Sequence, residues 1–155
     1  MKVMSKRIIY TIVILILCTT LAVAFHLRHR MFFLLAYHRS VSAVVASRSD
    51  WGFEFAFDAA DECVAPEDRR FVQNHCLAAL SSEDTFYPNM VAFYVLIEQR
   101  ENLLDETVAS LKTLAIDPAF SKTKQESFVY VIKEYEKKKA LSVTLKNMKV
   151  QGTGN

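Results

Sequence analysis

An uninterrupted apolar segment near the start of the chain most constrains what this protein can fold into. Residues 8–25, IIYTIVILILCTTLAVAF, are eighteen residues without a charged side chain. As an α-helix the segment would be about 27 Å long, close to the thickness of the hydrocarbon core of a bilayer. The sequence therefore predicts a transmembrane signal-anchor over residues 8–27, which follows a short N-terminal segment, residues 1–7.

The same segment also has features of a cleavable signal peptide. Basic residues precede it, and Ala22-Val23-Ala24 fits a small-x-small cleavage site. Against cleavage, Arg28 and Arg30 would follow the cut directly, and apolar residues resume at 31–37. We favour an uncleaved anchor, with cleavage as the alternative.

Two cysteines lie outside the apolar segment, and they bear on which side of the membrane the domain occupies. An even pair, here Cys63 and Cys76, in a small exported domain is usually a disulfide. A bridge between them would close a loop of about 14 residues, worth about 3 kcal/mol in the chain-entropy model. Lys and Arg are nearly balanced across the apolar segment, so charge leaves the orientation open. We therefore predict a cytoplasmic N-terminus, a single pass through the inner membrane and a periplasmic C-terminal domain; two reduced thiols in a cytosolic domain are the alternative.

Charge is strongly segregated along the 155 residues. Residues 1–49 carry seven Lys or Arg and no acid, residues 50–117 have a net charge of −10, and residues 118–155 have one of +5. No basic patch accompanies a recognition motif, and the acidic middle would repel phosphates. We expect no nucleic acid among the partners. The basic C-terminal region is expected to pack on the acidic middle.

The remaining chain predicts a small, mainly α domain. A juxtamembrane amphipathic segment covers residues 28–49, a disulfide-stapled helical domain covers 50–141, and a polar tail covers 142–155. Within the domain we expect helices at 66–80, at 88–100 as the most buried one, at 107–115 with Asp105 as its cap, and at 121–141.

Residues 41–57 leave helix and strand open. Phe53-Glu54-Phe55-Ala56-Phe57 alternates as a strand would, so a short β-hairpin with residues 41–46 is one possibility. Helix is slightly favoured, because residues 58–62 continue without a helix breaker. The aromatic residues fit a core most simply. As candidate functional residues, they form a surface for a partner or ligand, made of Trp51, Phe53, Phe55 and Phe57.

No pattern of reactive residues predicts an enzyme. Cys63, His75 and Cys76 lack the paired spacing of zinc ligands, and no C-x-x-C motif is present. Three glycines in the whole chain provide no phosphate-binding loop, and no nucleophile, base and orienting group stand at a recognisable spacing. We expect no catalytic residue, no metal and no cofactor.

An anchor without catalytic chemistry favours an accessory role. The leading hypothesis is a single-pass inner-membrane protein whose periplasmic helical domain binds and stabilises a protein partner, such as a membrane regulator, an envelope assembly or another single-pass membrane protein. One alternative is an immunity or exclusion protein that neutralises a toxin. Another is a sensor of a lipid or bile-type ligand that uses the aromatic cluster.

Overall fold

The computed structural model describes residues 6–47, 50–82 and 86–152, and all regular structure in these ranges is helical. The elements in chain order are α1 (Lys6–His26), α2 (Arg28–Ser47), η1 (Asp50–Phe53), α3 (Glu54–Asp61), α4 (Pro66–Ser81), α5 (Phe86–Glu98), η2 (Gln99–Asn102), α6 (Asp105–Ile116) and α7 (Lys122–Gly152). The mainly α prediction is confirmed. The hairpin considered for residues 41–57 is wrong, since no strand occurs in the described ranges.

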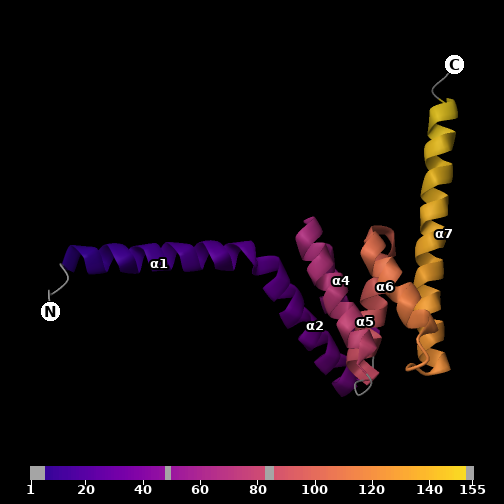
Figure 1. Ribbon diagram of the computed structural model, residues 1–155, viewed down its shortest axis with the longest axis horizontal. Coiled ribbons are helices and arrows are strands. Elements are labelled where there is room, and N and C mark those ends of the chain that lie inside the picture. Colours follow the sequence, from indigo (N-terminus) through magenta and orange to yellow (C-terminus); the bar gives the residue numbers. More distant parts are fainter. Residues whose placement is uncertain (1–5, 48–49, 83–85, 153–155) are drawn as a thin grey trace.

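Helices α2 to α7 form three helical hairpins that stack side by side (Figure 1). The closest packing is within the hairpins: α2 packs on α3, α4 on α5, and α6 on α7. Neighbouring hairpins meet through α4, which packs against α2 and α6, and through α5, which packs against α3 and α7. The domain thus has two layers, α2–α4–α6 and α3–α5–α7, with α5 at the centre.

The central position of α5 explains its composition. Val91, Ala92, Val95 and Leu96 are all buried, and α5 contacts helices of both layers. A helix that is apolar on nearly all sides needs neighbours on all sides. The prediction of a helix beginning near residue 88 is confirmed, and its final turn tightens into η2.

The N-terminus of α4 has the residues that helix N-termini prefer, whereas the N-terminus of α6 lacks a capping side chain. Pro66 occupies the first turn of α4 and Glu67 follows it, as expected at the positive end of a helix dipole. The predicted cap of α6 is wrong: Asp105 is the first helical residue, and Leu104 stands at the N-cap without a side-chain bond. The Leu104 N–H instead donates to Gln73 Oε1 at 3.0 Å.

The turn before α3 packs so closely against α2 that a side chain in place of Gly52 would be crowded. A Cβ on Gly52 would lie 3.1 Å from Ala43 Cβ and 3.1 Å from Val44 Cγ2. Nearby, buried Ser40 Oγ accepts the Ala56 N–H at 3.0 Å. Both contacts hold the short helix α3 on α2.

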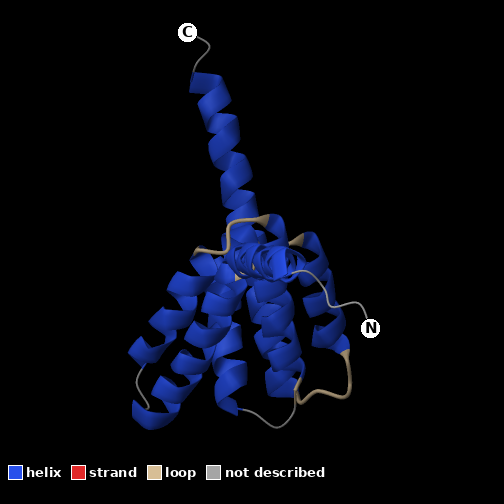
Figure 2. Ribbon diagram, turned by 90° about the vertical axis from the view of Figure 1, so that its left-hand side faces the viewer, coloured by secondary structure: helices blue, strands red, loops and turns tan. Residues whose placement is uncertain are grey.

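Helices α1 and α7 extend beyond the bundle. The α1 axis is bent by 57° from α2 at Leu27, and α1 projects away from the three hairpins (Figure 1). The C-terminal part of α7 rises above the other helices (Figure 2). The predicted end of this helix near residue 141 is too early, because α7 continues to Gly152 through most of the expected polar tail.

Candidate functional site

Five aromatic rings form a continuous row across the α3–α5–α7 layer. The centroid of Phe57 on α3 lies 6.1 Å from that of Phe53 at the end of η1, and Phe53 lies 4.8 Å from Tyr94 on α5. Phe93 lies 5.4 Å from Tyr94 and 6.1 Å from Tyr130 on α7. All four distances are within the range of favourable aromatic contacts. We call these five residues the aromatic row.

The row is attached to the core at Phe53 and reaches the surface at Tyr94 and Tyr130. Phe53 is buried, with 4% of its surface exposed, whereas Tyr94 and Tyr130 are 42% and 51% exposed. Phe57 and Phe93 are half-buried. Rings fixed at one end by the core lose little freedom when a partner covers the other end, so the row is suited to binding.

A cavity of about 330 Å³ adjoins the Phe93 and Tyr94 part of the row. It lies between α5 and the start of α7, with Phe86 and Met90 among its apolar lining residues. Lys124 lies at its rim, where Nζ donates to the Ser82 carbonyl at 2.8 Å. The cavity therefore combines apolar walls with a few polar groups, as small-molecule sites do.

The structure separates the residues that the sequence grouped. Phe53 and Phe57 belong to the aromatic row, four residues apart on one side of the short helical segment. Phe55 lies elsewhere, with the Arg39 guanidinium 4.0 Å above its ring centroid. The side chain of Trp51 lies outside the described residues.

Three members of the row were not predicted. Phe93 and Tyr94 were expected to be buried with the rest of α5, and Tyr130 was assigned no role. The available signal was the position of Tyr130: it neighbours buried Val131 in sequence but falls on the outward side of α7. A single exposed aromatic residue is common on protein surfaces, so this position alone does not identify a binding surface.

The predicted disulfide is not formed. Cys63 and Cys76 are both buried and both free. Cys63 precedes α4 in the loop after α3, whereas Cys76 lies within α4, and the two side chains have different surroundings. The Cys63 Sγ instead faces the carbonyl oxygens of Ala59 at 3.5 Å and His29 at 3.7 Å. Burial raises the pKa of the Cys63 thiol to about 11, and nearby Asp68 raises it further, which disfavours the thiolate form.

His75 occupies an aromatic enclosure between α4 and α2. Its ring centroid lies 4.7 Å from Tyr37 and 5.7 Å from Phe33, both edge-on, and 6.5 Å from Phe71. Its Nε2 is buried without a hydrogen-bond partner. Burial lowers the pKa of His75, and the nearby His38 lowers it further. Within the described residues, no three His, Cys, Asp or Glu side chains are grouped to hold a metal ion.

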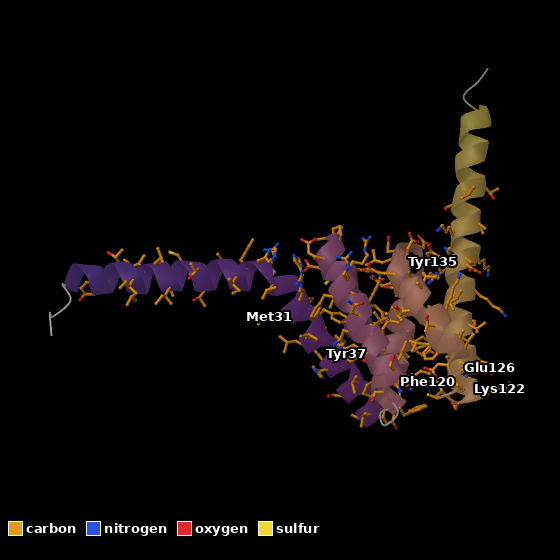
Figure 3. The ribbon with its side chains drawn as sticks, in the orientation of Figure 1. Met31, Tyr37, Phe120, Lys122, Glu126 and Tyr135 are labelled. Atoms are coloured by element: carbon orange, nitrogen blue, oxygen red, sulfur yellow. The ribbon has the colours of Figure 1, made fainter. Side chains whose placement is uncertain are left out.

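The described side chains of α1 do not pack against the hydrophobic core of the domain. Every side chain from Tyr10 to His26 is exposed, and the apolar surface continues onto α2 at Met31, Phe32 and Leu35. Met31 lies on the side of α2 away from the other helices (Figure 3). Among the described residues, no individual helix has both the length and the apolarity to cross a membrane; 10–26 and 28–46 satisfy these criteria only as a bent pair.

Comparisons of the chain with protein-family models, with curated proteins and with solved structures find no match.

Proposed function

We propose that the protein is a membrane-anchored accessory protein whose helical domain binds a protein partner through the aromatic row. The observation that carries this proposal is the succession of five neighbouring rings that runs from half-buried Phe57 through buried Phe53 to exposed Tyr130. Tyr and Phe are enriched at the centres of protein interfaces. The partner that fits is a protein that presents an apolar helix or segment to these rings.

Anchoring is supported by the chemistry of α1. Eighteen uncharged residues, 8–25, precede two arginines, and the described side chains of this helix are exposed. An exposed apolar surface of this size is unfavourable in water and favourable in a bilayer. We infer that α1 inserts in the membrane with residues 28–35 near the headgroups, and that the partner is a membrane protein or assembly close to the same bilayer.

Membrane anchoring by α1 does not determine on which side of the membrane the helical domain lies. The periplasmic assignment relied on a disulfide, and with Cys63 and Cys76 both free, cysteine usage no longer favours an exported domain. The near balance of Lys and Arg across α1 adds no preference. Attachment of a membrane-impermeant biotin reagent to exposed Lys133 in intact cells would place the domain outside; protection until lysis would place it in the cytoplasm.

Site-specific crosslinking tests the partner proposal. With a photoreactive phenylalanine analogue at Tyr130, we expect a crosslinked species in native membranes. The double variant Tyr94→Ala/Tyr130→Ala should reduce co-purification of the crosslinked protein at least tenfold, about 1.4 kcal/mol. Ile116→Ala is the matched control, because Ile116 is exposed and lies outside the row. Equal capture by the double variant and the control would contradict the proposal.

Toxin neutralisation is a form of partner binding that would use the same surface. The identity of the crosslinked protein separates the two roles. A cellular membrane protein supports the accessory role, and a protein delivered by a competing strain in mixed culture supports immunity.

The cavity of about 330 Å³ beside the row favours a second candidate, a sensor of an apolar ligand such as a lipid or a bile acid. Its apolar walls include Phe86 and Met90, and Lys124 stands at the rim for an acidic group. A thermal shift with bile acids or lipids that is lost in Met90→Trp, which fills the cavity, would support this role. Absence of any shift across these compounds would remove it.

A further inference from the structure

Helix α2 exposes large apolar side chains at the end that adjoins α1. Met31, Phe32 and Leu35 are 55%, 54% and 69% exposed, whereas Phe33 is fully buried. Apolar residues that cluster on a surface mark a contact with protein or membrane, while scattered ones are ordinary. These three side chains continue the exposed apolar surface of α1. The outer surface of α2 is therefore suited to the same surroundings as α1.

The exposed residues of α2 between Arg28 and Ala46 share one side of the helix. At 3.6 residues per turn they fall within about 140° of its circumference. We call them the outer side of α2. The opposite side, which includes Phe33 and Tyr37, belongs to the core of the domain. Lipid cannot surround α2 as it would surround α1, but the outer side of α2 can lie on a membrane surface.

The bend between α1 and α2 determines how steeply α2 leaves the bilayer. With α1 along the membrane normal, α2 is inclined to that normal by the 57° of the bend. Each residue then rises about 0.8 Å along the normal, compared with about 1.5 Å in an upright helix. By this rise, Leu35 stands about 6 Å and Arg39 about 9 Å farther from the bilayer centre than Arg28. Interfacial helices bury their apolar side by about 5–10 Å, so the first three turns of α2 remain within reach of lipid.

The outer side of α2 is directed toward the bilayer. Met31 lies on the side of α2 turned away from the other helices (Figure 3). The helices that follow α2 lie on its opposite side, beyond the bend and away from α1 (Figure 1). A bilayer around α1 therefore meets the outer side of α2 without overlapping the rest of the domain.

Two exposed arginines on the outer side lack a carboxylate partner. Among the described residues, the arginines paired with a carboxylate are Arg30, Arg70 and Arg100. Arg28 and Arg39 instead lie over aromatic rings, with the guanidinium carbon 4.2 Å and 4.0 Å from the ring centroids. A guanidinium matches the geometry of a phosphate group. Both arginines can therefore bind the phosphates of lipid headgroups.

We propose that the outer side of α2 docks on the phospholipid surface beside α1. Met31, Phe32 and Leu35 contact the upper acyl chains, and Arg28 and Arg39 bind headgroup phosphates. Zwitterionic and anionic phospholipids both carry this phosphate, so docking requires no anionic lipid. The inference rests on the insertion of α1 that forms part of the proposed function. Docking holds the domain, and with it the aromatic row, in one orientation relative to the bilayer of the partner.

The test places a nitroxide spin label on Leu35→Cys in the full chain, within phosphatidylcholine nanodiscs. Cys18→Ser removes the exposed cysteine, and the two cysteines that remain are buried. Power saturation compares collisions of the label with oxygen, which enters lipid, and with a nickel chelate, which stays in water. Because interfacial helices bury their apolar side, the oxygen-to-nickel ratio at Leu35 should exceed that at the control site Ile116→Cys by at least about threefold. Ile116 is 81% exposed and lies on α6.

A label on Leu17→Cys reports the anchor separately. Labels in lipid at both Leu17 and Leu35 support the proposal. A label in lipid at Leu17 with one in water at Leu35 would overturn the docking of α2 and leave the membrane anchor in place. A label in water at Leu17 would overturn the anchor and the docking together.

Substitutions assign the docking to the outer side of α2. Phe32→Glu should lower the oxygen-to-nickel ratio at Leu35 by at least about twofold, because a carboxylate is disfavoured among acyl chains. Ile116→Glu is the matched control, an exposed apolar residue outside α2. An unchanged ratio in Phe32→Glu would overturn the proposal. If circular dichroism shows that Phe32→Glu unfolds the domain, Met31→Glu replaces it.

The double variant Arg28→Gln/Arg39→Gln tests the phosphate contacts. The ratio at Leu35 should fall in this variant as well, because the helix loses its attachment to the headgroups. Arg70→Gln is the control, since Arg70 is exposed and pairs with Glu106 on α6. Equal ratios in the double variant and the control would overturn the role of the two arginines.

Discussion

Gln73 is the buried polar side chain that joins α4 to the start of α6. Its Oε1 accepts the Thr107 hydroxyl at 2.7 Å and the Leu104 N–H at 3.0 Å, and its Nε2 donates to the Asn102 carbonyl at 3.0 Å. A fully buried amide is tolerated because these bonds satisfy both ends of it.

Gln73→Leu preserves approximate volume and removes all three bonds. The hydroxyl, N–H and carbonyl left behind are not compensated, so we expect the free energy of unfolding to fall by about 3 kcal/mol. Denaturant unfolding of the protein in zwitterionic micelles, followed by circular dichroism, measures the change. Asn74→Ala, at an exposed position on the same helix, is the control. A loss equal to that of the control would contradict the role assigned to Gln73.

His75 makes the stability of the domain dependent on pH. Because burial and then His38 lower its pKa in the folded state, protonation is easier after unfolding. Its contribution to stability is complete above the unfolded-state pKa of about 6.5 and is lost as the pH falls toward the lower folded-state pKa. We expect His75→Phe, which fits the aromatic enclosure, to reduce the loss of stability between pH 7.5 and pH 5.

The measurement is the urea midpoint of both proteins across this pH range. Arg30 and Asp68 form an ion pair on the same α2–α4 contact, and Arg30 lies 5.7 Å above Phe71. Both groups are retained in the variant, so their effects cancel in the comparison. His26→Gln, on exposed α1, is the control. Parallel profiles for His75→Phe and the original protein would contradict the assignment.

The thiols provide a third prediction at this scale. Since Cys63 and Cys76 are buried and free, both should resist alkylation in the folded protein. Both should react without a reductant once the chain is unfolded. Cys18 is a third free cysteine and is replaced by Ser in these proteins. Gel mobility after labelling with a bulky maleimide then gives the number of free domain thiols, and the Cys63→Ser variant assigns the bands. Labelling that requires reduction would establish the disulfide that the structure lacks.

At the scale of elements, α7 combines two different segments. Phe128, Val131 and Ile132 are buried against the bundle, whereas the described side chains from Lys139 to Thr144 are exposed. Apolar packing explains the first segment. The second continues as helix because no proline or glycine interrupts residues 140–151 and its residues include good helix formers.

We expect the exposed end of α7 to contribute little to stability. A chain that ends at Thr144 should have an unfolding free energy within about 0.5 kcal/mol of the original. A chain that ends at Tyr130 loses Val131 and Ile132 and should fail to fold. Circular dichroism and denaturant unfolding of the two truncations provide the comparison. A large loss on removal of residues 145–155 would show that this part packs on the domain.

The segment around α3 illustrates how packing resolves an ambiguous pattern. Phe53, Phe55 and Phe57 alternate as strand residues do, yet the chain is helical here. In a helix, residues four apart share a side, so Phe53 and Phe57 stack while Phe55 turns toward Arg39. Packing on α2 stabilises the helical conformation of this segment. Ser40 Oγ accepts the Ala56 N–H, and Gly52 permits a close approach to α2.

At the scale of the whole molecule, α1 and the domain are nearly independent. The described side chains of α1 up to His26 are exposed, while the core is formed by α2 to α7 together with η1 and residues 63 and 103. Deletion of residues 1–27 should therefore change the free energy of unfolding of the domain by less than about 1 kcal/mol.

The same deletion should release the chain from membranes, since α1 supplies the apolar surface that we assign to the bilayer. Carbonate extraction of membranes reports attachment, and circular dichroism reports folding of the released domain. Retention of the deleted chain in the membrane fraction would show that α2 or the partner holds it there. Loss of helical signal would show that α1 supports the fold.

The sequence by itself determined the helical class, the apolar N-terminal segment and most helix positions. These features follow from local properties: hydrophobic periodicity, proline in a first turn and the length of an uncharged run. The helix that begins at Pro66 and the buried α5 were predictable for this reason. The end of α7 was not, because apolar periodicity stops where the core stops while helical backbone continues.

Only the tertiary structure decided which distant side chains meet. The row from Phe57 to Tyr130 joins residues of three hairpins. No spacing in the sequence could reveal it. Cys63 and Cys76 show the converse case, since an even pair of cysteines suggested a bond, whereas both are buried as free thiols in the folded domain. Contacts between elements depend on how their apolar faces pack, and this geometry is set by the whole core rather than by any local segment.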